Sequence, residues 1–167
     1  MGATGRLRVG IAGGPSGYFY NDEATRIFFK QGYFYTGDLA VMREDGRMAL
    51  MGRITDVLNV SGNKVSPIEL EAKSSALLDG RTVCLFSLPG ETGGENLHAV
   101  VETSQPIDAE RLAAVFGATF DNVASISVLF LDRFPRNAVG KILRAELRAN
   151  VVASPEHTLI IEPMSRR

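Results

Sequence analysis

The chain has 167 residues, of which 45% are hydrophobic and 22% are charged, a balance typical of a globular protein with a hydrophobic core. Its net charge is −1, so no overall basic field would attract nucleic acid or an anionic membrane. No apolar stretch is long enough to cross a membrane, and the first residues lack the apolar core of a signal peptide. We therefore expect a cytoplasmic protein that binds neither nucleic acid nor membrane.

Few residues of the chain could serve as thiol or imidazole ligands. Cys84 is the single cysteine, so no disulfide can form within the chain. It lies in an apolar run at residues 83–86, which favours a buried, inert thiol over a nucleophile. His98 and His157 stand apart from other potential ligands, so no metal site of histidine and cysteine is expected.

Short strands and turns dominate the first part of the chain. The predicted elements are strands at residues 5–11, 33–38, 39–43 and 47–51 and a short helix at 22–29. Asn21 is placed to cap the helix, and the pair Asp45-Gly46 is a strong hairpin signal. Little amphipathic helix is available to close a core here. We therefore interpret residues 1–54 as the β-rich edge of a larger, N-terminal domain.

The pattern of the second part predicts a small α+β domain. The predicted strands cover residues 57–60, 83–88, 97–102 and 125–131, and the predicted helices cover residues 67–78, 109–116 and 141–151. Ser66 and Glu69 are spaced as a capping box around the first helix, and Asp108 is placed to cap the second. This order indicates a small mixed sheet with flanking helices over residues 55–150. Residues 151–167 form a weakly patterned tail.

Two polar positions suggest recognition of a ribose. Asp38 ends an aromatic strand in the segment Tyr35-Thr36-Gly37-Asp38, and a carboxylate that accepts two parallel hydrogen bonds suits a diol. An aspartate that satisfies the backbone of a turn is the alternative. Arg53 could supply a fork of donors to a ribose or phosphate, and a surface ion pair is the alternative.

Three further features accompany these positions. The Ser61-Gly62 pair would allow close approach of a ligand to the backbone. Glu69 and Glu71 favour an interpretation as acidic residues that stabilise a helix N-terminus. Lys141 follows a predicted flexible loop at residues 134–140 and opens a predicted helix, so it could reach an anionic reaction centre. A Gly-Lys pair alone is weak evidence, and this one lacks the hydroxyl residue of a phosphate-binding G-x-x-x-x-G-K-[ST] loop.

In combination, the segments at residues 35–38, 52–71 and 135–144 resemble the adenylate-forming superfamily of AMP-binding ligases. This superfamily includes acyl- and aryl-CoA synthetases, luciferases and the adenylation domains of peptide synthetases. The resemblance covers residues 5–147, and residues 59–67 are most similar to short-chain or aryl-CoA synthetases. It implies that the chain is a C-terminal lid domain preceded by the end of the large AMP-binding domain.

The resemblance implies a reaction in two steps. A carboxylate attacks the α-phosphate of ATP to give acyl-AMP, and the CoA thiol then takes the acyl group. The implied catalytic residue is Lys141, which would bridge the carboxylate and the α-phosphate. The implied residues for nucleotide or CoA binding are Asp38 and Arg53 at the ribose, Ser61 and Gly62 at the pantetheine tunnel, and Lys64 in support of that tunnel.

The chain departs from the family pattern in ways that limit the expected activity. Thr55 occupies a hinge position where the family commonly has Asp or Lys. The phosphate loop and the acyl pocket would lie in a partner N-terminal domain, present in cis or in trans, and Mg²⁺ is implied for the whole enzyme without a ligand here. We expect the chain alone to be inactive, and a non-catalytic binding or regulatory module is the alternative. The apolar residues Phe28, Phe29, Phe34 and Met42 have few local partners, so we expect exposed apolar surface in residues 1–54, with self-association or mobility there.

Overall fold

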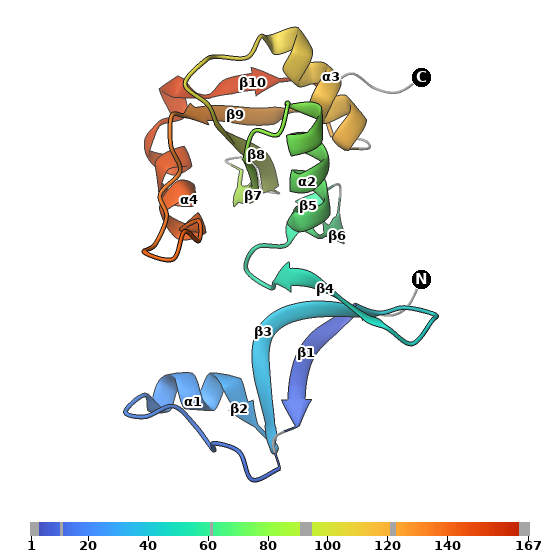
Figure 1. The fold of residues 1–167 in the computed structure, drawn as a ribbon, viewed down its shortest axis with the longest axis vertical. Coiled ribbons are helices and arrows are strands. Elements are labelled where there is room, and N and C mark those ends of the chain that lie inside the picture. The colour runs from blue at the N-terminus through green and yellow to red at the C-terminus, as the bar shows by residue number, and fades with distance from the viewer. Residues whose placement is uncertain (1–3, 11, 61, 91–94, 121–122, 164–167) are drawn as a thin grey trace. The chain divides into compact units, whose positions relative to one another are not determined.

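A computed structural model describes residues 4–10, 12–60, 62–90, 95–120 and 123–163 of the chain (Figure 1). The chain forms two units, Met1–Asp56 and Val57–Arg167. None of the helices in these described ranges could span a membrane.

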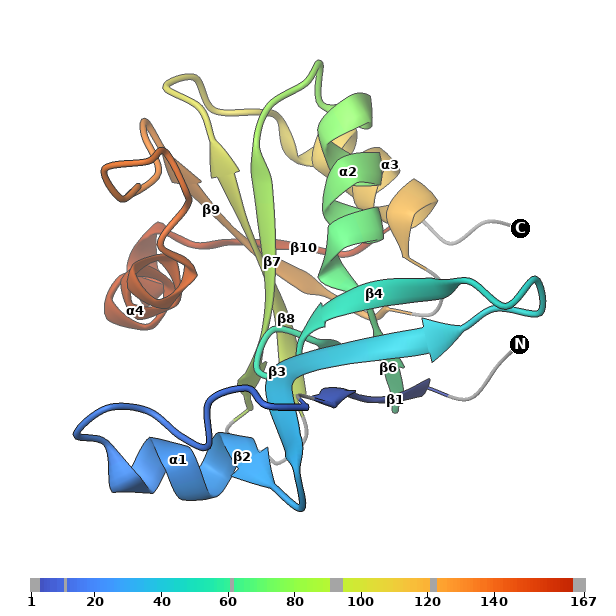
Figure 2. The ribbon, with the colours of Figure 1, turned by 60° about the horizontal axis from the view of Figure 1, so that its bottom comes forward.

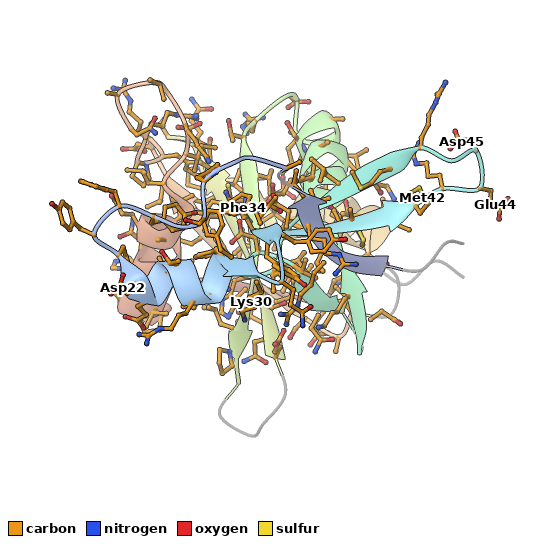
Figure 3. The ribbon with its side chains drawn as sticks, turned by 90° about the horizontal axis from the view of Figure 1, so that it is seen from below. Asp22, Lys30, Phe34, Met42, Glu44 and Asp45 are labelled. Atoms are coloured by element: carbon orange, nitrogen blue, oxygen red, sulfur yellow. The ribbon has the colours of Figure 1, made fainter. Side chains whose placement is uncertain are left out.

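The first unit is built around one long strand. β3 (Tyr33–Met42) pairs antiparallel with β1 (Thr4–Gly10), β2 (Phe29–Lys30) and β4 (Met48–Arg53). The helix α1 (Asp22–Phe28) leads directly into β2, as Figure 1 shows. The β3–β4 hairpin has its tip at the opposite end of the unit from α1, where Figure 3 labels Met42, Glu44 and Asp45.

Local signals in the sequence account for the ends of these elements. The side chain of Asn21 accepts a hydrogen bond from the N–H of Ala24 at 2.9 Å, which caps α1 as predicted. Residues 44–46 turn the chain between β3 and β4, also as predicted. The predicted break near Asp38 is wrong, because a register shift between Leu39 and Ala40 bends the strand without ending it. Asp38 therefore lies within β3.

The first unit has almost no core of its own. Ala40 is the only residue of this unit among the buried hydrophobic residues that the structure describes. The prediction that its aromatic residues lack local partners is wrong for Phe28, Phe29 and Phe34, which are half-buried and linked through ring contacts with Tyr18 or with one another. Met42, by contrast, is 53% exposed.

The second unit contains the predicted mixed sheet. Its strands are β7 (Val83–Pro89), β8 (Glu95–Glu102), β9 (Ile126–Leu131) and β10 (Leu159–Ile161), in the order β10-β9-β8-β7. β8 and β9 are parallel, and the other two pairs are antiparallel. A separate hairpin of β5 (Leu58–Val60) and β6 (Asn63–Val65) precedes the sheet.

Helices cover both faces of this sheet (Figure 2). α2 (Pro67–Leu77) and α3 (Ala109–Thr119) lie on one side, and α4 (Arg144–Ala153) lies on the other. The strand residues alternate between the two faces. One core therefore joins side chains of the sheet to α2 and α3, and includes Leu85, Ala99, Val128, Leu112 and Phe116. The other core joins the sheet to α4, and includes Cys84, Phe86, Val100, Leu147 and Val151.

Three predictions for the second unit need correction. The Ser66–Glu69 capping box does not form, since the buried Ser66 hydroxyl has no hydrogen-bond partner among the described residues. The last helix begins at Arg144 rather than Lys141, because Ile142 pairs with Arg136 in an isolated bridge. The predicted tail includes β10, which pairs with β9 and contributes the buried Ile161 to the core.

Candidate functional site

Asp38 and Arg53 face each other across β3 and β4. They are cross-strand partners, and Arg53 Nε lies 3.1 Å from Asp38 Oδ1. Arg53 Nη1 also donates to the carbonyl oxygen of Thr36 at 2.9 Å. The Asp38 side chain is 25% exposed and the Arg53 side chain 56% exposed. The pair therefore presents a fixed carboxylate and a partly solvated guanidinium at one surface, a combination suited to a polar ligand such as a diol.

Gly37 makes this arrangement possible. Its φ of +81° is unfavourable for other residues, and a Cβ atom there would lie 3.3 Å from Arg53 Nη1. The carbonyl oxygen of Gly37 also accepts a hydrogen bond from the N–H of Ile54 at 2.9 Å. The glycine thus supplies both the backbone conformation and the space for the guanidinium next to Asp38.

Lys141 lies in a tight hairpin rather than at the start of the predicted helix. The N–H groups of Val139 and Lys141 both donate to Asn137 Oδ1, at 3.2 and 2.9 Å. Asn137 N–H donates to the carbonyl oxygen of Lys141, and Gly140 N–H donates to that of Asn137, each at 2.9 Å. Gly140 takes a φ of +82°, which suits the turn. One asparagine thereby fixes the backbone on which the lysine is carried.

The two segments that flank this turn, the limbs of the hairpin, are hydrogen-bonded to each other. Arg136 and Ile142 form the isolated bridge, and Leu143 N–H donates to the carbonyl oxygen of Pro135 at 2.9 Å. Lys141 is exposed, and its ammonium forms no ion pair with any residue that the structure describes. The hairpin therefore presents a free cation to solvent from an ordered backbone.

The remaining sequence-predicted residues belong to the β5–β6 hairpin. Gly62 has a φ of +83° with open space at its Cβ position, and Lys64 pairs with Asn59 across the hairpin and is exposed. Ser61 lies outside the described residues. The structure thus brings Asp38 together with Arg53, and Gly62 together with Lys64, whereas Lys141 lies on a different element of the second unit from Gly62 and Lys64.

Four charged residues, two in the segment that carries Lys141 and two on α2 and β8, were not predicted from the sequence to form ion pairs. Glu102 forms an ion pair with Arg136 at 2.8 Å, and Glu71 forms one with Arg144 at 2.8 Å. The sequence favours an interpretation of Glu71 as a helix-terminal charge, but this residue lies beyond the first turn of α2 and its Oε1 also accepts the N–H of Leu85 at 2.8 Å. Their sequence signal is modest: each arginine lies within the segment at 135–144, and each glutamate borders apolar residues.

Burial shifts the pKa values of two further titratable groups, Cys84 and His98. Burial raises the pKa of Cys84 to about 12, with a further increase from the negative charge of Glu71. The free thiol is therefore protonated at neutral pH, as expected for an inert core cysteine. Burial lowers the pKa of His98, whose Nδ1 atom has no hydrogen-bond partner among the described residues. No group of three or more His, Cys, Asp or Glu residues that could hold a metal occurs in the described part of the chain.

Comparison with known proteins identifies the relatives of the chain. No family model matches it. It is 31% identical over 147 residues to a probable CoA ligase of Humulus lupulus, covering 86% of this chain and 28% of that protein. It is 32% identical over 144 residues to the oxalate–CoA ligase of Arabidopsis thaliana, covering 83% and 28%. The chain thus spans under a third of the length of these curated relatives.

Solved structures show the same relationship. The amide bond synthetase McbA from Marinactinospora thermotolerans is 28% identical, with a TM-score of 0.70 over 89% of this chain and 31% of that chain. ATP-bound MatB from Rhodopseudomonas palustris is also 28% identical, with a TM-score of 0.66 over 81% and 28%. The fold is that of the lid region of adenylate-forming enzymes. The chain is a homologue of the CoA ligases of the AMP-binding superfamily, as its motifs predict.

Proposed function

We propose that the chain is the C-terminal part of an ATP-dependent acid–thiol ligase and acts together with an N-terminal AMP-binding domain. In the first step a carboxylate oxygen attacks the α-phosphorus of ATP, forming acyl-AMP and releasing pyrophosphate. In the second step the CoA thiol attacks the acyl carbon, forming the thioester and releasing AMP. The CoA ligases among the curated relatives support the thiol acceptor, and the similar ATP-bound MatB supports the nucleotide.

The Asp38–Arg53 pair is the proposed ribose site. Arg53 Nε lies 3.1 Å from Asp38 Oδ1, and ribose hydroxyls would donate to the second carboxylate oxygen, Oδ2. The second contact of Arg53, to the carbonyl oxygen of Thr36, keeps the guanidinium in place when a ligand arrives. Preformed geometry of this kind lowers the entropy cost of binding.

The observation that carries the proposal most directly is the exposed, unpaired Lys141 on its ordered hairpin. An ammonium brought to the α-phosphate neutralises the charge that develops there during acyl-AMP formation. Because Asn137 fixes the backbone of Lys141, the ammonium can be delivered without ordering a loop at the moment of reaction. Preorganised charge lowers the activation barrier more than charge that must first be positioned.

The β5–β6 hairpin is the proposed border of the pantetheine tunnel. Open space at Gly62 would let a narrow ligand approach its backbone, with Ser61 beside it and Lys64 offering a cation nearby. Mg²⁺ would accompany ATP in the whole ligase. We assign it no ligand in this chain, since its described residues contain no cluster of carboxylates or histidines suited to it.

The nearly coreless first unit supports a partner domain. Residues 1–54 would complete the sheet and core of the N-terminal AMP-binding domain, which also supplies the phosphate loop and the acyl pocket. Under this proposal the chain alone is inactive, because neither the triphosphate nor the acid would be held.

The test is ATP–pyrophosphate exchange by the chain joined to, or mixed with, an N-terminal AMP-binding domain of a related CoA ligase. The proposal predicts exchange with the wild-type sequence, and a loss of roughly 100- to 1,000-fold with Lys141→Ala. Lys73→Ala, on α2, serves as a matched control that removes a lysine elsewhere in the second unit. Absence of exchange with every N-terminal domain tried, together with retained nucleotide binding, would favour a non-catalytic binding module.

A further inference from the structure

Two carboxylates from other elements anchor the Lys141 hairpin at its two ends. Glu102, the last residue of β8, holds the limb that enters the turn. Its Oε1 accepts the N–H of Phe134 at 2.7 Å, and its Oε2 pairs with Arg136 Nη2 at 2.8 Å. Arg136 Nη1 in turn reaches the carbonyl oxygen of Gly140 at 3.4 Å. A single carboxylate thus connects the sheet to the residue next to Lys141.

The limb that leaves the turn is held by Glu71 on α2. Arg144, the first residue of α4, donates from Nη1 to Glu71 Oε1 at 2.8 Å and from Nη2 to the carbonyl oxygen of Leu85 at 2.7 Å. Glu71 Oε1 also accepts the N–H of Leu85, and the guanidinium of Arg144 lies 4.9 Å from the centre of the Phe86 ring. α2, β7 and the start of α4 are therefore joined through one ion pair.

These ion pairs differ from ordinary surface pairs. The side chains of Glu71 and Arg144 are 16% and 23% exposed, and those of Glu102 and Arg136 are 19% and 35% exposed. Exposed pairs contribute little, whereas charge-assisted hydrogen bonds shielded from water are shorter and stronger. Both pairs also bind backbone groups of the sheet or its connections. They can therefore fix position as well as contribute stability.

The consequence concerns how Lys141 can move. The hairpin has its own hydrogen bonds, and each limb is tied to the sheet or to α2. Local flexing is therefore restricted, and a change in the position of the ammonium larger than a change of rotamer requires the whole second unit to move. A positional error of about 1 Å in a reacting group can lower a rate by about 100-fold.

We propose that Glu71 and Glu102 are positioning residues that set the place of Lys141 during acyl-AMP formation. The inference rests on the function proposed above for Lys141. It assigns these two carboxylates no contact with substrate, and they act only through the hairpin that carries the lysine.

The kinetic test compares the two half-reactions in the ligase formed with an N-terminal AMP-binding domain. Glu102→Ala and Glu71→Ala should lower the rate of ATP–pyrophosphate exchange by roughly 10- to 100-fold, with little change in the KM for ATP. Thioester formation from supplied acyl-AMP should be nearly unchanged, because Lys141 acts in the first step. Glu102→Gln should recover part of the lost rate, since its amide oxygen can still accept the N–H of Phe134.

Asp79→Asn provides the matched control, because Asp79 is an ion-paired carboxylate of the same unit whose partners are Arg81 and Arg111. It should leave both half-reactions unchanged. Parallel loss of both half-reactions in the Glu71 and Glu102 variants would show a purely structural role and would overturn the inference. Unchanged rates of ATP–pyrophosphate exchange in the Glu71 and Glu102 variants would also overturn the inference.

Amide hydrogen exchange in the chain by itself separates this inference from the proposed function. In Glu102→Ala, the amides of Val139 and Lys141, which donate to Asn137 Oδ1, should exchange at least severalfold faster than in the wild type. Amides of the β7–β8 ladder should be unaffected. Equal protection of the hairpin in both proteins would overturn the positioning role, whether or not the ligase reaction is observed.

Discussion

Arg53 Nη1 lies 3.3 Å from the position that a Cβ atom on Gly37 would occupy. The guanidinium that contacts Asp38 therefore passes directly over the glycine that precedes this aspartate. Gly37 also has a φ of +81°, so backbone conformation and side-chain contact are coupled at one residue. The order Gly-Asp in β3 consequently matters for the geometry of the proposed ribose site as well as for the fold.

Gly37→Ala should weaken nucleotide binding in addition to lowering stability. A non-glycine residue in this conformation costs about 1–2 kcal/mol, and the added methyl group would displace the guanidinium from Asp38. Gly46→Ala is the matched control, because Gly46 has a φ of +78° with nothing near its Cβ position. We expect both variants to lower the free energy of unfolding similarly in urea titrations. Only Gly37→Ala should raise the KM for ATP in the assembled ligase, and an equal effect of both would contradict the coupling.

Arg53→Lys should raise the KM for ATP despite conserving the charge. The guanidinium contacts Asp38 through Nε and Thr36 through Nη1 at the same time, and a lysine cannot reproduce this fork. Loss of one charge-assisted hydrogen bond corresponds to roughly a tenfold increase in the KM for ATP. Arg47→Lys tests the same exchange at a surface pair, where Arg47 and Asp45 are 3.9 Å apart and exposed, and should have no effect. The proposed role of Arg53 fails if both variants behave like the wild type.

Features that depend on neighbouring residues could be predicted from the sequence, whereas features that depend on strand pairing could not. Asn21 as a helix cap and residues 44–46 as a hairpin turn follow from local signals, and both are confirmed. The continuity of β3 was missed because its pairing with β1, which is distant in sequence, overrode the local pattern. The late start of α4 was missed because Ile142, in a helix-like context, instead pairs with Arg136 in a hairpin.

The anchoring carboxylates illustrate the same limit. Glu71 and Arg144 are separated by 73 positions, and Glu102 and Arg136 by 34. A glutamate in the first turns of a helix has a sufficient local explanation in the helix dipole, so nothing in its own segment indicates a distant arginine. Lys141 could be selected from the motif at 135–144, but the order of its hairpin depends on Asn137 and on these tertiary contacts.

The chain by itself should self-associate through the β3–β4 ribbon of the first unit. Met42 and Met48 are cross-strand partners, as are Ala40 and Leu50, which places Met42, Met48 and Leu50 on one face. These three side chains are 53%, 52% and 60% exposed, and a contiguous apolar face of this kind favours association. Sedimentation should show concentration-dependent oligomers that Leu50→Lys reduces. Leu77→Lys, at a 42% exposed position on α2, should not reduce them, and a monomer at all concentrations would contradict the prediction.

Cys84 should resist alkylation in the folded protein. Burial raises its pKa to about 12, so only a minute fraction of the thiol is ionised at pH 8, and the thiolate is the reactive form. Iodoacetamide labelling at pH 8, followed by mass spectrometry, should be slow in buffer and rapid in 6 M guanidinium chloride, where the ordinary pKa is restored. Rapid labelling of the folded chain would show that the sheet face beneath α4 opens readily, contrary to the packing of Cys84 with Leu147 and Val151.

Mild acid should destabilise the chain through His98. Because burial lowers its pKa below the ordinary value of 6.5, the unfolded chain binds a proton more readily than the folded chain. Its contribution to stability is therefore fully present above pH 6.5 and decreases as the pH falls from that value toward the lower pKa of the folded state. Urea unfolding at pH 7.5 and 5.5 should show this loss in the wild type and in His157→Gln. His98→Leu should reduce the difference between the two pH values, because a side chain that cannot be protonated removes this linkage. An equal pH dependence in all three proteins would show that the imidazole of His98 is accessible to protons in the folded state.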